Sequence, residues 1–386
     1  MDINRKAELA EAQHREAKKA KNDEAYRDAH RKVLKREDNF NFVTTPMNRE
    51  EYPYDKLTKA GQFAPLPPSK NTFTDAAYPK IHIPFRKLVE DLSRGQKAAL
   101  KEDHEQYIVV IPFGAGPKFY QSYTTLKQDV VAFLDGFQIE KGDYRISLPS
   151  ECLSKKVQDY QTPWPFFIEG AATLLQNFLL WQQTFPIDKK LVLNFLPVDI
   201  NFQSWVIATY RCGAVKNDTA RIARALRKIK KATCKNRAIT DIVNKICTSQ
   251  GFTGHVTLAC EEMTHSWNLE YIRTLQNDSK IRVWQLTGKP ITTNDDDHRK
   301  LVNAIRSLTV MVGMDNLKAD GKARLECIWC KSEMHQSHAC PFPDMVPGWR
   351  GPTREKMNKK AKQDSPESRS DTGQTRSSFH RAGRGG

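Results

Sequence analysis

Four residues near the C-terminal end of the sequence have the types and spacing of a metal site. Cys327, Cys330, His335 and Cys340 follow the pattern C-x2-C-x4-H-x4-C. Three thiolates and one imidazole are the donors that tetrahedral Zn²⁺ prefers. Because these donors fill the coordination shell and leave no position for water, the pattern predicts one structural zinc ion rather than a catalytic one. His338 is an alternative to His335, although its single-residue gap to Cys340 would strain tetrahedral closure.

The zinc unit is too short to fold by apolar burial. The fourteen residues from Cys327 to Cys340 cannot enclose a hydrophobic core, so we expect metal binding to supply their folding free energy. The alternative is that these are idle or buried thiols in a tail. The other five cysteines are scattered singly, which indicates reduced thiols beside one metal site and not a disulfide framework.

This spacing resembles that of the retroviral nucleocapsid-type zinc knuckle, over these fourteen residues. The resemblance implies binding of single-stranded RNA or DNA, with bases stacked on a platform that corresponds to Ile328 and, beside it, Trp329. The alternative for Trp329 is that its ring covers the zinc. The family usually has glycine just after the second cysteine and just before the histidine, where this chain has Lys331 and Met334. Since those glycines allow a tight turn, the departures affect the expected geometry more than metal binding.

Two motifs beyond the knuckle extend the resemblance. The stretches C-P-F-P at 340–343 and P-G-W-R-G-P at 347–352 are similar to the corresponding region of uncharacterised, mobile-element-associated, Gag-like proteins of mushroom-forming fungi. This implies a Gag-like or transposon-derived nucleic-acid binder. The mixed helix and strand pattern of the central region departs from the all-helical capsid domain of Gag proteins.

Basic residues lie on both sides of the knuckle, as a groove that follows phosphates requires. Besides Ile328 and Trp329, the predicted nucleic-acid contacts are Lys322, Arg324, Lys331, Arg350, Arg354, Lys356, Lys359 and Lys360. The net charge of +16 and the pI of about 9.4 also favour an acidic partner.

A second basic cluster lies in the middle of the chain. Residues 214–245 contain ten Lys or Arg and two Asp, a local net charge of 10 − 2 = +8. On a helix over 217–232, five cations fall on the side opposite the apolar residues: Arg221, Arg224, Arg227, Lys228 and Lys231. Such a helix could lie along a phosphate backbone or could be an ordinary surface helix.

Apolar residues concentrate in the centre of the chain, and this sets the expected organisation. The expected parts are a polar charged helix or disordered arm at 1–40, a proline-rich linker or wrap at 41–104, a central domain at 105–312, the zinc knuckle with flanks at 313–355 and a disordered basic tail at 356–386. Hydrophobic patterns predict strands at 107–111, 190–197, 204–211, 255–260 and 280–286, and helices at 122–136, 169–185, 217–232, 237–249 and 297–312. This alternation predicts an α+β or α/β central domain.

Enzymatic motifs are incomplete in this sequence. Gly114-x-Gly116 follows a predicted strand, but Phe119 replaces the third glycine of a dinucleotide loop, and Gly288-Lys289 lacks the earlier glycine of a phosphate loop. We therefore expect a protein that is not an enzyme and that binds single-stranded RNA or DNA. The alternative function is a protein-interaction scaffold in which the zinc unit is only structural.

The sequence also carries expectations about location and partners. The N-terminus has no apolar secretory signal, and the most apolar stretch, 166–181, is shorter than a membrane span and is interrupted by polar residues. We expect an intracellular protein without a membrane partner, with the basic clusters favouring the nucleus over the cytoplasm. The central domain would serve assembly or protein partners.

Overall fold

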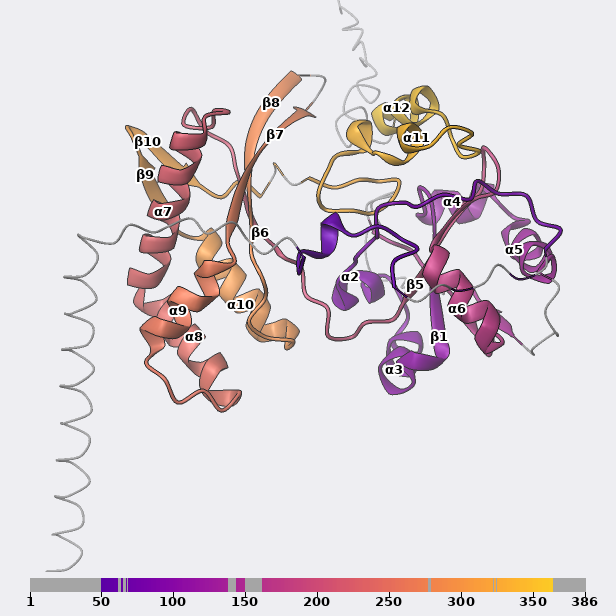
Figure 1. The fold of residues 1–386 in the computed structure, drawn as a ribbon, viewed down its shortest axis with the longest axis horizontal. Helices are drawn as coiled ribbons and strands as arrows, with labels where there is room; N and C mark the ends of the chain where they lie inside the picture. Colours follow the sequence, from indigo (N-terminus) through magenta and orange to yellow (C-terminus); the bar gives the residue numbers. More distant parts are fainter. Residues whose placement is uncertain are drawn as a thin grey trace, which may run out of the picture. The chain divides into compact units, whose positions relative to one another are not determined.

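A computed structural model describes residues 50–363, except 62, 63, 65, 66, 68, 138–143, 150–161, 277, 278, 322 and 324. The chain forms two compact units (Figure 1). The first contains Gln203–Arg273 and Lys280–Arg324 together with residues 50–52. The second contains Pro53–Phe202, Thr274–Ser279 and the chain from Leu325 onward. The expected central domain, 105–312, is thus spanned by parts of both units, and the zinc ligands belong to the second.

A five-stranded antiparallel sheet organises the second unit, in the order β2-β3-β1-β5-β4. The strands are β1 (Tyr107–Pro112), β2 (Arg145–Ser147), β3 (Phe166–Glu169), β4 (Thr184–Pro186) and β5 (Val192–Pro197). In the central strand, Val110 pairs with Phe166 on one side and Phe195 on the other. The continuous apolar run 108–111 is fully buried because both faces of this strand are covered.

Alternate residues of β1 enter two different cores, as the two-residue period of a strand requires. Ile108 and Val110 pack in a cluster with the helices α5 (Leu126–Asp135) and α6 (Thr173–Gln182). Val109 and Ile111 pack in a second cluster, which contains α2 (Phe85–Val89) and the C-terminal segment that carries the predicted zinc ligands. The three cysteines among the predicted zinc ligands therefore share a hydrophobic core with the sheet, contrary to the expectation of a knuckle without one.

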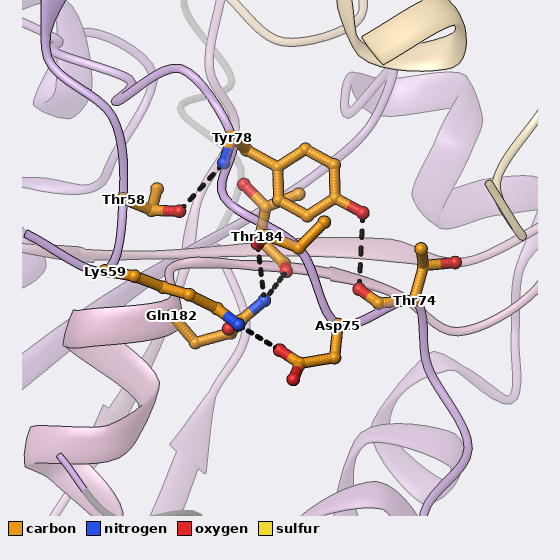
Figure 2. A network of polar contacts seen from close by, with 8 residues as sticks. Thr58, Lys59, Thr74, Asp75, Tyr78, Gln182 and Thr184 are labelled. Carbon is orange, nitrogen blue, oxygen red and sulfur yellow. Dashed lines mark hydrogen bonds and ion pairs between the residues drawn. The ribbon is translucent and has the colours of Figure 1, made fainter. Parts of the chain in front are cut away.

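The proline-rich region contributes to this unit from residue 53 onward. Leu57 forms an isolated bridge with Pro79, and Tyr78 is fully buried in the same apolar cluster as residues of β1 and β5. Figure 2 shows the polar contacts that hold the region: the Tyr78 amide donates to Thr58 Oγ1 at 3.0 Å, and the Tyr78 hydroxyl donates to the Thr74 carbonyl at 3.2 Å. From residue 53 onward, the described part of 41–104 thus packs as an integral part of the second unit.

Gln182, the last residue of α6, also binds the proline-rich region. The Gln182 side chain donates to the carbonyls of Ala76 and Thr184, at 3.3 and 3.2 Å, and Lys59 forms an ion pair with Asp75 (Figure 2). Because the buried amide of Gln182 binds both the strand and the proline-rich region, it fixes one against the other.

The first unit combines a three-stranded sheet, in the order β6-β8-β7, with a two-stranded hairpin and four helices. The elements are β6 (Val206–Tyr210), α7 (Thr219–Lys235), α8 (Arg237–Ser249), α9 (Val256–His265), β7 (Asn268–Gln276), β8 (Ser279–Thr287), α10 (Asp295–Arg306), β9 (Thr309–Val312) and β10 (Asp315–Lys318). The end of β7 after Arg273 and the first residue of β8 belong to the second unit. The four helices and these sheets enclose one apolar core. In Figure 1 the helices gather beside the β6–β8 sheet.

Local capping explains where these helices begin. Asp218 caps α7 by accepting from the Arg221 amide at 2.7 Å, and Asn236 caps α8 by accepting from the Ile239 amide at 3.2 Å. The predicted helices at 217–232 and 237–249 are confirmed by these two elements. The predicted helix at 297–312 is shorter, since α10 ends at Arg306 and the chain enters β9.

One predicted strand is wrong. Residues 255–260 begin a helix, α9, in which the His255 side chain accepts from the Thr257 amide at 3.3 Å. The alternating apolar residues at 256, 258 and 260 imitate a strand, but Leu258 is exposed while Val256, Ala259, Cys260 and Met263 are buried at helical spacing.

The remaining helices of the described chain are short: η1 (Pro53–Asp55), α3 (Arg94–Glu102), η2 (His104–Gln106), α4 (Pro117–Ser122), η3 (Ser337–Ala339), α11 (Phe342–Met345) and α12 (Arg354–Gln363). Mixed helices and antiparallel sheets confirm the predicted α+β class. The expected arm at 1–40 lies outside the described residues. Of the predicted disordered tail at 356–386, residues 356–363 belong to the helix α12, and the rest lies outside the described residues. Within those residues, no helix has the length and apolar character needed to cross a membrane.

Candidate metal centre

Cys327, Cys330, His335 and Cys340 come together at one point of the second unit. Their ligand atoms all lie within 4.8 Å of one another, and Cys330 Sγ and His335 Nε2 are 3.3 Å apart. In a tetrahedral site with Zn–S bonds of about 2.3 Å, neighbouring donors lie about 3.8 Å apart. The four residues are therefore close enough to hold one metal ion. The three cysteines are buried, and each is reduced in the structure.

Backbone hydrogen bonds shape the loop that carries these donors. The Lys331 amide donates to the Cys327 carbonyl and the Cys327 amide donates to the Ser332 carbonyl, both at 2.9 Å. Ser337 links the two ends, because its Oγ accepts from the Ile328 amide at 3.0 Å and its carbonyl accepts from the Cys340 amide at 3.3 Å. Ser337 was not singled out in the sequence, where nothing but its place between the ligands distinguishes it.

The donors influence one another's protonation. Burial raises the pKa of the Cys327 thiol, but hydrogen bonds with Cys330, Cys340 and His335 outweigh it and hold this pKa well below its usual range. Burial, together with hydrogen bonds to Cys327 and Cys330, raises the pKa of Cys340 well above its usual range. Burial lowers the pKa of the His335 imidazole, but the Cys330 and Cys327 sulfurs raise it to about 10. Three buried thiolates repel one another, so a divalent cation is the charge that allows all three to ionise together.

The structure selects His335 over His338. The metal-binding cluster in the described chain contains His335 and does not contain His338. The carbonyl of His338 instead accepts a hydrogen bond from Arg354 at 2.8 Å. His338 is therefore not part of the candidate donor set.

Lys331 explains how the loop turns without the glycine of the nucleocapsid-type pattern. Its φ is +63°, in the left-handed region that glycine favours. The side chain is 3% exposed, and its Nζ donates to the Ala115 carbonyl at 2.6 Å. Met334, at the other expected glycine position, has no positive φ. A positive φ is unfavourable for lysine, and the same residue makes a buried hydrogen bond that stabilises the turn.

Substitution of Lys331 separates these two contributions. Lys331→Gly and Lys331→Ala both delete the ammonium donor, but only glycine adopts a φ of +63° without steric cost. We expect urea unfolding of the zinc-loaded chain to find Lys331→Gly more stable than Lys331→Ala by about 1 kcal/mol. We also expect Lys331→Ala to be the least stable of the three proteins. Equal stability of the two variants would mean that the turn stores no backbone strain.

Trp329 packs against the turn that follows β1. It is 4% exposed, and its carbonyl accepts from the Gly114 amide at 3.0 Å. A Cβ on Gly114, which has a φ of +71°, would meet the Trp329 ring at 3.1 Å. The sequence marks 114–116 as a turn but contains no local signal that it receives the knuckle. In this position the ring serves packing and has no open face for a base.

Ile328 and the other predicted contacts lie in different surroundings. Ile328 is half-buried and packs against both cores of the second unit. Arg350 and Lys356 are exposed, with Arg350 Nε donating to the Ile187 carbonyl at 2.9 Å and Lys356 Nζ donating to the Lys189 carbonyl at 3.4 Å. Arg354 forms an ion pair with Asp344. These bonds fasten the C-terminal segment to its own unit.

Four predicted contacts cannot be placed. Lys322 and Arg324 lie outside the described residues, as do the side chains of Lys359 and Lys360, whose backbone belongs to α12. Their proposed contact with nucleic acid stays a prediction.

Comparison of the chain with protein-family models, with curated proteins and with solved structures found no match. Function is therefore inferred from the chemistry and charge of this chain.

Proposed function

We propose that this chain is a nucleic-acid-binding protein without enzymatic activity, and that its Cys3His cluster is a structural zinc site. The observation that supports the zinc is the convergence of three buried sulfurs and one imidazole nitrogen within 4.8 Å. A set of four such donors is complete for Zn²⁺ and leaves no open position for a substrate. The zinc would hold the segment from Leu325 to Met357 against β1, because residues of this segment lie in the same apolar core as that strand.

The nucleic-acid part of the proposal is supported by charge. A net charge of +16 at pH 7 attracts a polyanion, and binding releases the counterions that phosphates condense. Arg350 and Lys356 keep part of their surface exposed beside the zinc segment. The burial of Trp329 and Lys331 argues against a platform at the knuckle itself, so phosphate contacts carry this proposal rather than base stacking at the zinc.

A salt titration tests the proposal. The whole, zinc-loaded chain is titrated against a fluorescent, unstructured single-stranded oligonucleotide at several salt concentrations between about 50 and about 200 mM. We expect log affinity to fall linearly with log salt, with a slope of about −3 if about four phosphates are neutralised. Absence of binding to both RNA and DNA at the lowest salt would contradict the proposal.

The second candidate is a protein-interaction scaffold with a structural zinc. The burial of Trp329 and the engagement of Lys331 with Ala115 favour it, since both side chains serve the fold. A chain that binds one zinc ion but neither RNA nor DNA at low salt would support the scaffold.

A further inference from the structure

Helix α7 presents a continuous basic face in the first unit. Seven of its seventeen residues are Lys or Arg, and none is Asp or Glu. At about 100° per residue, six of the cations fall within a sector of about 120°. They are Arg221, Arg224, Arg227, Lys228, Lys231 and Lys235. The buried residues Ala225, Leu226 and Ile229 lie on the opposite side.

The seventh cation marks the edge of this face. Lys230 is 8% exposed, and burial lowers its pKa. It therefore belongs to the packed side of the helix, and the six remaining cations define what we call the α7 basic face.

Two residues of the α7 basic face are available to a ligand. Arg224 and Arg227 are exposed, and neither forms a hydrogen bond or ion pair within the part of the chain that the structure describes. Like charges three and four residues apart destabilise a helix by about 0.2–0.5 kcal/mol per pair. The helix tolerates this repulsion because its apolar side is anchored in the core. A polyanion along the face would remove it.

The dimensions of the α7 basic face suit a nucleic-acid strand. From Arg221 to Lys235 the helix rises about 21 Å, at about 1.5 Å per residue. Phosphates along one strand of a B-form duplex rise about 3.4 Å per nucleotide along the axis, so a fully stacked strand would place about six nucleotides along the face, and an extended single strand would place fewer. Arginine is also the cation that binds a phosphate through two parallel hydrogen bonds.

An apolar element lies beside these cations. Lys228 Nζ donates to the carbonyl of Met311 in β9 at 2.8 Å, which places the β9–β10 hairpin next to the face. Met311 is 58% exposed and Met314, in the turn of the same hairpin, is 98% exposed. Thioether side chains make favourable contacts with aromatic rings. A single strand, whose bases are unpaired, could use both the cations and these methionines.

We propose that the α7 basic face is the main phosphate-binding surface of the chain for single-stranded nucleic acid. This inference rests on the proposed function and deepens it, because it moves the contact from the zinc segment to a helix of the other unit.

Charge reversal with a matched control tests the inference. The variant Arg224→Glu with Arg227→Glu changes the net charge by −4, and so does the control Arg94→Glu with Lys101→Glu on exposed positions of α3. Binding of an unstructured oligonucleotide is measured for the whole chain across salt concentrations. We expect the α7 variant to bind at least about ten-fold more weakly, with a salt slope smaller by about 1.4. The control should bind within about two-fold of wild type. It changes the net charge by the same amount but leaves the α7 basic face intact, and salt screens charges that lie more than about 10 Å from a phosphate.

A folding control and a conservative variant allow each possible binding result to be interpreted. Circular dichroism checks that both variants remain folded, and Arg224→Lys with Arg227→Lys should retain most of the affinity. If wild type binds but the α7 variant equals wild type or falls no further than the control, the inference is overturned while the proposed function stands. If wild type binds no oligonucleotide, both fail. Binding to vesicles of anionic lipid without binding to oligonucleotides would replace the proposed partner by a membrane surface.

Discussion

Replacing Cys330 with serine is expected to abolish stoichiometric zinc binding and to destabilise the second unit. Cys330 is fully buried and its Sγ lies 3.3 Å from His335 Nε2, so its sulfur belongs to the centre of the donor set. A serine hydroxyl is a poor zinc ligand, and the buried thiols that remain lose their counter-charge. We expect the free energy of unfolding to fall by more than about 4 kcal/mol, in the range of losses of a bound metal.

The measurements for Cys330→Ser are zinc content by elemental analysis and stability by urea unfolding. Cys212→Ser is the matched control, because Cys212 is a reduced, partly buried cysteine of the first unit that lies outside the zinc cluster. The control should keep one zinc and near wild-type stability. If Cys330→Ser still bound one zinc per chain with undiminished affinity, the proposed ligand set would be wrong.

Trp329→Ala is expected to destabilise the chain by about 3–5 kcal/mol, the usual cost of deleting a buried tryptophan. The ring contacts Gly114 beyond the end of β1, so its loss leaves a cavity between the zinc segment and the sheet. Zinc binding should persist at low temperature, because all four ligands remain. Urea unfolding and zinc content measure the two effects separately.

The same variant distinguishes packing from base stacking. Ile328→Ala is the control, because this neighbouring platform residue is half-buried and should cost less. We expect oligonucleotide affinity, measured where each variant is folded, to change little for Trp329→Ala. A variant of wild-type stability with strongly reduced affinity would show that the ring stacks on bases instead.

Local patterns predicted the parts of the fold that local chemistry determines. The apolar run at 108–111 became the central strand, and the predicted helices at 217–232 and 237–249 became α7 and α8, which Asp218 and Asn236 cap. The convergence of Cys327, Cys330, His335 and Cys340 was also predictable, because all four lie within fourteen residues and metal coordination geometry limits the spacing of such donors.

Long-range contacts account for what was missed. Tyr78 looked like part of a linker, yet it stacks on Phe342, with ring centroids 5.7 Å apart, across more than two hundred residues of sequence. The division into two units is hidden for the same reason, since the second unit is assembled from segments that are far apart in the chain. Burial of Trp329 depends on the Gly114 turn, and no spacing near residue 329 indicates that partner.

Lys331 illustrates a departure from a family pattern that the structure explains. The absent glycine suggested altered geometry, but the lysine adopts the positive φ of the glycine turn and binds the Ala115 carbonyl. The turn is retained, and the side chain that replaces glycine gains a role in attaching the knuckle to the sheet.

Native mass spectrometry of the whole chain, purified under reducing conditions and supplied with one equivalent of zinc, tests the central claim most directly. We predict one zinc ion per chain. A strong chelator should remove this ion and shift the charge-state distribution of the chain toward the higher charges of a partly unfolded protein. A folded chain that remains without zinc under these conditions would contradict the assignment of Cys327, Cys330, His335 and Cys340 as its ligands.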